Sequence, residues 1–168
     1  MAWTTPITFS AGATLTAAQL NTGLRDNLNA AFPGGTTWAA WAPTYANLTI
    51  GNGTVVARYI QVGSVVIARW QFTLGSTSAV GSGPTISFPV TAASTGYTAA
   101  GSPLGQATFV DTGVGRYYGV ATYQSTTTFS PTSQDVATYV RQAAVSATAP
   151  FTWVSTDIMM IQVVYEAA

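Results

Sequence analysis

The sequence of 168 residues contains no cysteine, histidine or lysine, and its charged side chains are five arginines and five carboxylates. The absence of cysteine excludes disulfides and thiol chemistry. The three missing residue types also leave only carboxylates, tyrosine, serine and threonine as a general base or nucleophile. The chemistry available for an enzyme active site is therefore narrow.

Charge is scarce as well as limited in kind. Charged residues make up 6% of the chain, whereas an average soluble domain has about 25%. A surface with few charges and no net charge protects a monomer poorly against self-association. We therefore expect much of the surface to be covered in use, by copies of the same chain or by other proteins.

Nucleic acid, membrane and secretory roles are not expected. The five arginines are spread along the sequence and form no evident basic patch, which argues against binding of nucleic acid. The longest apolar runs, residues 65–68 and 158–161, are far shorter than the ~18–20 residues of a membrane span. Residues 1–12 have neither the basic nor the apolar region of a secretory signal.

Residues 15–32 predict one amphipathic α-helix near the front of the chain. Thr16 and Gln19 have the spacing of an N-terminal capping box. Residues 32–35, with the sequence Phe-Pro-Gly-Gly, are expected to end the helix and to form a pliable joint.

The leucines of this helix form a narrow stripe. Leu20, Leu24 and Leu28 recur at every fourth position, and Leu15 stands at the position of a hydrophobic staple. Such a stripe needs a partner, and two arrangements are open: a lid over the rest of the chain, or contact with other copies or a socket in an assembly. The joint and the polar far side of the helix favour the second, so these four leucines are predicted to serve attachment or oligomerisation.

From Trp38 onward the apolar period changes to two, which is typical of half-buried antiparallel strands. Residues 63–74 alternate in this way, with Trp70 and Phe72 on the apolar face. Further strands are expected at residues 47–50, 54–61, 85–90, 104–110, 116–124, 136–145 and 157–165. The prediction is a mainly β protein: an antiparallel β-sandwich or jelly-roll-like domain, residues 36–168, preceded by an N-terminal arm and helix, residues 1–35.

Glycine-containing turns are expected between several strands. Asn52-Gly53 predicts a hairpin that joins its two neighbouring strands, and tight turns are predicted at Gly63 and at residues 81–84. The last strand, residues 157–166, is apolar on both faces. That pattern is typical of a central strand and equally of a strand at a subunit interface, and both remain open.

Three parts of the chain resemble bacteriophage virion proteins, in particular minor tail, tail-tip and fibre proteins. They are Trp3–Pro6 with Leu15–Asn21 and Leu24–Leu28; Ile50–Tyr59 with Gly63 and Leu74–Thr77; and Ser87–Val90 with the ending Val164–Ala168. Residues 91–135 carry no such similarity. The shared motifs mark folding units and no catalytic apparatus, so the resemblance implies a place in a particle. It also implies a trimer, since related proteins commonly form trimers, some on tails and some on heads.

No catalytic residue, metal ligand set or cofactor is predicted. A glycosidase would need two carboxylates about 5–10 Å apart, and Asp111 and Asp135 are the pair that the sequence leaves open for that role. Aspartate is common in turns in any case. The carboxylates are isolated from one another in the sequence, which gives no ligand run for a metal ion.

The polar and aromatic residues suit a surface contact. The sequence is 12% aromatic, and several rings fall where strands meet loops. We predict an exposed contact patch made of Asp111, Arg116, Tyr117, Tyr118 and Tyr123, since rings in loops serve as interface anchors.

Taken with the resemblance, these features predict a non-enzymatic structural protein of a phage virion, assembled in the host cytoplasm. The expected form is a homotrimeric tail-tip or fibre-like component that contacts other virion proteins and host surface glycans. A capsid decoration protein that clamps neighbouring capsid subunits is the first alternative, and a free carbohydrate-binding module is the second.

Overall fold

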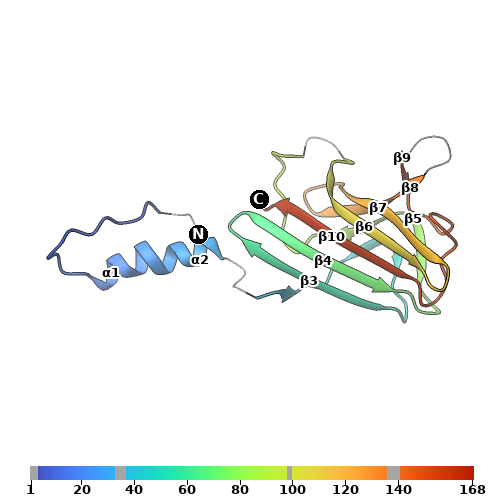
Figure 1. The fold of residues 1–168 in the computed structure, drawn as a ribbon, viewed down its shortest axis with the longest axis horizontal. Helices are drawn as coiled ribbons and strands as arrows, with labels where there is room; N and C mark the ends of the chain where they lie inside the picture. The colour runs from blue at the N-terminus through green and yellow to red at the C-terminus, as the bar shows by residue number, and fades with distance from the viewer. Residues whose placement is uncertain (1–3, 33–36, 98–99, 136–140) are drawn as a thin grey trace.

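The computed structural model describes residues 4–32, 37–97, 100–135 and 141–168, and it is mainly β with one helical segment at the front (Figure 1). The predicted fold class is confirmed. The helical segment consists of α1 (Ala17–Leu20), the π-helical turn η1 (Asn21–Asp26) and α2 (Asn27–Ala31). The strands are β1 (Ala39–Ala40), β2 (Tyr45–Thr49), β3 (Thr54–Val62), β4 (Val65–Thr73), β5 (Ala79–Ser87), β6 (Pro103–Asp111), β7 (Gly115–Tyr123), β8 (Thr128–Asp135), β9 (Arg141–Ala144) and β10 (Ile158–Glu166).

The strands form one antiparallel sheet that curls into two facing layers. Its order is β1-β3-β4-β10-β6-β7-β8-β5-β2, and β9 pairs with the outer part of β8. Trp41 connects β3 and β5, the second strand from each end of this path: its backbone N–H donates to Ala57 O (3.3 Å) and its indole Nε1 donates to Ser87 O (3.3 Å). The curled sheet is thus held closed as a flattened sandwich.

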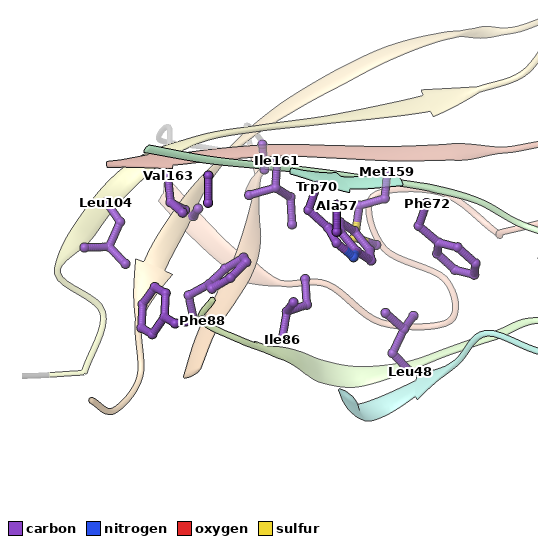
Figure 2. Packing of buried hydrophobic residues seen from close by; sticks show 14 of the residues in the cluster. Leu48, Ala57, Trp70, Phe72, Ile86, Phe88, Leu104, Met159, Ile161 and Val163 are labelled. Carbon is purple, nitrogen blue, oxygen red and sulfur yellow. The ribbon is translucent and has the colours of Figure 1, made fainter. Parts of the chain in front are cut away.

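Alternate residues of the strands fill the space between the layers (Figure 2). Trp70 and Phe72 of β4 are buried there, as the period of two predicts. The indole Nε1 of Trp70 donates to the hydroxyl of Tyr45 on β2 (3.3 Å), and the two rings lie 6.1 Å apart. Ile86 and Phe88 approach from the opposite layer. This shared core fixes which face of β3, β4, β10 and β6 points outward.

The last strand, β10, lies between β4 and β6, so the interpretation as a central strand is confirmed. Met159, Ile161, Val163 and Tyr165 point inward and are buried. Its outward side chains are only partly covered, which leaves an accessible surface on the outside of the sheet.

Two turn predictions have different outcomes. Gly63 makes the tight turn of the β3–β4 hairpin, with φ +58° and Val62 opposite Val65, as predicted. A turn also forms at Asn52-Gly53, where the Gly53 N–H donates to Ile50 O (2.9 Å). The hairpin prediction is nevertheless wrong, because β2 pairs with β5 while β3 pairs with β4 and β1. The turn carries the chain from one layer of the sandwich to the other.

The predicted turn at residues 81–84 is wrong, since these residues lie within β5. Gly81 is approached closely by the backbone of Asn47 on β2, and the β2–β5 register shifts at this point. Glycine here marks a bulge and a close backbone contact in the strand. Strand β8 was not predicted at all, and of the strand predicted at 136–145, residues 136–140 lie outside the described residues while Arg141–Ala144 form β9.

The buried hydroxyl of Tyr165 donates to Val90 O (2.8 Å) and accepts from the Val90 N–H (3.2 Å). Its contribution to the free energy of unfolding can be tested at alkaline pH. Burial raises the pKa of Tyr165. In the unfolded chain tyrosine titrates near about pH 10. The proton that the folded state retains therefore contributes stability that is complete below about pH 10 and is lost as pH rises further.

We expect Tyr165→Phe to lower the free energy of unfolding by about 1–3 kcal/mol at neutral pH, because both Val90 groups lose their partner. The variant should also show a shallower loss of stability above about pH 10, measured by urea denaturation at a series of pH values. Tyr118→Phe, at an exposed ring, is the matched control and should keep the full slope. Equal slopes for Tyr165→Phe and the unchanged protein would contradict this assignment.

Candidate functional site

The helical segment begins where the sequence predicts. Thr16 is the N-cap: its Oγ1 accepts from the Gln19 N–H (3.2 Å), and the Gln19 Oε1 accepts from the Thr16 N–H (2.9 Å). The capping box is thus confirmed. The segment ends at Phe32, whose N–H donates to Leu28 O (3.0 Å).

The residues before the helix fold back along one side of it (Figure 1). Thr4 binds Asn27 through three hydrogen bonds, from its N–H (2.9 Å) and Oγ1 (3.0 Å) to Oδ1, and from Nδ2 to Thr4 O (3.1 Å). Asn27 is 4% exposed, and its amide also donates to Gly23 O (3.1 Å). A side chain at Gly23 would meet Ile7 at 3.1 Å. The glycine inside the helix is thus explained by the arm that packs against it.

Leu20, Leu24 and Leu28 lie on a side of the helix that the arm does not cover, and Leu15 stands just before the N-cap. Leu15, Leu20, Leu24 and Leu28 are 47%, 42%, 57% and 52% exposed, and we call these four residues the leucine surface. In an α-helix a four-residue repeat drifts by about 40° at each step. The π-helical turn η1, with its i→i+5 bonds, has more residues per turn than an α-helix, which opposes this drift.

The helical segment projects from one end of the β-domain (Figure 1). It meets the β-domain at the β3–β4 turn, where the Gly63 N–H donates to Ala31 O (2.6 Å). Within the described residues, the leucines therefore do not form a lid over the sheet, which was one of the two arrangements that the sequence left open.

The predicted contact patch is only partly brought together. Arg116 and Tyr118 point outward from β7, and Tyr118 is 60% exposed. Tyr117 points to the inner side, with its ring 5.0 Å from Phe151. Tyr123 is 7% exposed and its ring stacks on Tyr97 at 4.9 Å. The prediction of one exposed patch is wrong for Tyr117 and Tyr123, because side chains alternate between the two faces of a strand.

Asp111 ends β6 at the turn that leads into β7, and it is half-buried. Asp135 ends β8, and its side chain lies outside the described part of the structure, so the pair of carboxylates stays untested. Asp157 is fully buried and accepts from the Thr112 N–H (3.0 Å) and the Val154 N–H (2.7 Å). Its carboxylate is used to tie two loops together.

A groove lies on the outward face of β3, β4, β10 and β6, and the sequence analysis missed it. Its volume is about 570 Å³. Two neighbouring rows of side chains cross the strands here, as the strand register requires. One row contains Val56, Gln71, Met160 and Thr108, and the other contains Arg58, Arg69, Gln162 and Gln106.

Two arginines face each other in this groove. Arg58 lies directly opposite Arg69 in the β3–β4 hairpin. The Nη2 of Arg58 donates to Trp38 O (2.9 Å), and Arg69 lies over the Trp38 ring, 4.8 Å from its centre. The expectation that the arginines are scattered is wrong for this pair. The turn at Gly63 was the available signal, because its register places residue 58 opposite residue 69.

Among the residues that the structure describes, no group of three potential metal-ligating side chains is present, and no helix is long and apolar enough to cross a membrane. Comparison with family models, with curated proteins and with solved structures finds no match to this chain.

The contact of Asn27 with Thr4 can be tested by hydrogen exchange. Asn27→Ala removes the acceptor of the Thr4 N–H, and we expect the local stability of the arm to fall by about 1–3 kcal/mol. The Thr4 amide should then exchange faster with solvent, measured by NMR or mass spectrometry. Asn29→Ala, at an exposed position of the same helix, should leave this exchange unchanged. Equal protection of Thr4 in both variants would contradict the role of Asn27.

The arginine pair should reduce stability, because like charges directly opposite on neighbouring strands repel. We expect Arg58→Glu to raise the free energy of unfolding by about 0.2–1 kcal/mol at low salt, and high salt to remove most of this gain. Arg116→Glu faces Val110 instead of an arginine and should give no gain. Arg58→Glu also removes the hydrogen bond to Trp38 O, so salt dependence is the deciding readout: an equal stability difference from the unchanged protein at low and high salt, measured by thermal denaturation, would contradict the repulsion.

Proposed function

We propose that the protein is a non-enzymatic structural component of a bacteriophage particle. In this proposal copies of the chain, three by expectation, assemble through the projecting helical segment, and the β-domain is directed outward to the host surface. The leading form is a tail-tip or fibre-like component. The particle setting depends on the resemblance of the sequence to virion proteins.

The observation that carries the proposal is the leucine surface. Three leucines on a helix that projects away from the sheet, and a fourth just before its N-cap, remain about half exposed in the single chain. Full burial of one leucine side chain is worth about 1.5–3 kcal/mol. A row of such side chains with nothing of its own chain to cover it therefore favours contact with neighbouring helices or with an apolar socket.

The composition supports the same proposal. With 6% charged residues, the surface offers little repulsion between copies. The chain also has no histidine, cysteine or lysine, and the buried Asp157 carboxylate is used by loop backbone. A structural role in assembly requires no catalytic side chain.

Serine at three leucines tests the proposal. We expect the triple variant Leu20→Ser, Leu24→Ser and Leu28→Ser to become a monomer at concentrations at which the unchanged protein is a trimer, measured by sedimentation equilibrium. The triple variant should also be lost from particles in a complementation experiment, since the apolar contact surface is removed.

The matched control carries serine at Asn21, Thr22 and Asn29, which are exposed polar positions of the same helical segment. It should behave like the unchanged protein. An unchanged protein that stays monomeric at micromolar concentration would contradict self-association, and unaltered incorporation of the leucine variant would contradict attachment through the helix.

A further inference from the structure

The groove on the outward face of the sheet has the features of a ligand site. Its volume of about 570 Å³ is within the range of about 300–1,000 Å³ that is common for small-molecule pockets. It is open to the outside, and the helical segment projects from a different part of the β-domain. Neither the helical segment nor the arm is among its lining residues.

The charge of the groove is unbalanced. Arg58 and Arg69 both line it. None of the five carboxylates of the sequence is a lining residue: they lie on the helix, at the ends of β6, β8 and β10, and in the buried contact between two loops (Asp26, Asp111, Asp135, Asp157 and Glu166). A chain with ten charged residues thus places two like charges side by side, at a cost in stability. A ligand of opposite charge would offset this repulsion.

Both guanidinium groups are held in position by Trp38. Arg58 donates to its carbonyl oxygen, and Arg69 lies over its ring. Each arginine has five N–H donors in a rigid plane, and this fork matches a carboxylate, sulfate or phosphate group. Since one backbone oxygen and one ring face occupy only part of these groups, the remaining donors are available for an anion.

Three glutamines continue the site beside the arginines. Gln71, Gln106 and Gln162 are exposed, and within the described residues no hydrogen bond joins their amides to the protein. An amide both donates and accepts, as a hydroxyl group does. Val56 and Met160 add apolar surface between these polar groups. The combination suits a ligand that carries many hydroxyl groups on a carbon ring.

We propose that this groove binds an acidic saccharide. The carboxylate of the sugar lies between Arg58 and Arg69, its hydroxyl groups bond to the glutamine amides, and its C–H face lies on Val56 and Met160. This proposal deepens the proposed function by naming the ligand class of the outward-facing β-domain, and it rests on that function for its biological setting. The site itself is a property of the isolated protein.

Calorimetry with the full chain tests the site. The probes are trigalacturonic acid as the acidic trisaccharide, maltotriose as a neutral one, and citrate as a carboxylate without a sugar ring. We expect trigalacturonic acid to bind more tightly than both other probes. Arg58→Gln and Arg69→Gln should each weaken its binding by about tenfold, because each loses charge-assisted hydrogen bonds.

Arg116→Gln is the matched control, since it removes the same charge from the same side of the sheet, three strands away from Arg69. Its affinity for trigalacturonic acid should stay within about twofold of the unchanged protein, because the charge that it removes lies outside the groove. Thermal denaturation of the two groove variants should give midpoints equal to or above that of the unchanged protein, which separates loss of binding from loss of folding.

Four results would overturn the proposal: no binding of trigalacturonic acid, equal binding of maltotriose or citrate, an equal loss of binding in Arg116→Gln, or tighter binding of a short single-stranded oligonucleotide. Each of them leaves the test of the leucine surface untouched, since that test measures oligomeric state and incorporation. Failure of the leucine test likewise leaves the calorimetry valid. The two proposals therefore fail separately.

Discussion

The contact of Trp70 with the opposite layer is the interaction on which the rest of the structure depends. Trp70 stands on β4, the third strand in the order, and its indole N–H donates to the hydroxyl of Tyr45 on β2 at the far end of that order. An indole that is buried needs a partner for its N–H, and here the partner is available only because the sheet curls. The curl in turn assigns one face of β3, β4, β10 and β6 to the core and the other to the outside. The groove and its arginines follow from this assignment.

The molecule has two exposed features that its composition makes unusual. One is apolar, the leucine surface on the helical segment, and the other is cationic, the Arg58–Arg69 pair on the β-domain. They lie on different parts of the chain and have opposite chemical character, so they suit different partners. An apolar surface gives affinity through burial, whereas a charged site selects by charge and hydrogen-bond geometry. This separation is consistent with a protein that is held at one end and makes contact at the other.

Much of the fold could be predicted from the sequence, because local rules and the final structure agree. The capping box at Thr16, the turn at Gly63 and the alternation around Trp70 depend on residues close in the chain. The predictions fail where contacts between residues far apart in the sequence determine which strands pair and where a strand ends. Asn52-Gly53 forms its turn, yet the Asn52 N–H donates to Thr77 Oγ1, its Oδ1 accepts from the Thr77 N–H, and the two flanking strands enter different layers. Residues 81–84 stay in a strand because a bulge accommodates their glycines.

The candidate site was harder to predict, and the reasons differ between its parts. The exposure of the leucines could not be read from the stripe alone, which also suits a lid, although the joint and the polar far side of the helix favoured attachment or oligomerisation. The inward position of Tyr117 and Tyr123 follows from alternation along β7, once the face of one residue is known. The arginine pair was missed, although the register of the hairpin at Gly63 places residue 58 opposite residue 69. No sequence pattern indicated the role of Asn27. Its partner Thr4 lies more than twenty residues earlier in the chain and reaches it only because the arm folds back along the helix.

Because the arm folds back along the helix, it determines which residues lie at the outer tip of the helical segment. Thr4 is bonded to Asn27, close to the β-domain, while the chain reverses at the far end through Ser10–Ala13, with Gly12 at φ +80°. The outermost point is therefore a closed bend and not a loose chain end. Thr4, the first described residue, lies at the neck between helix and sheet, and whatever receives this unit would first meet a blunt, uncharged tip.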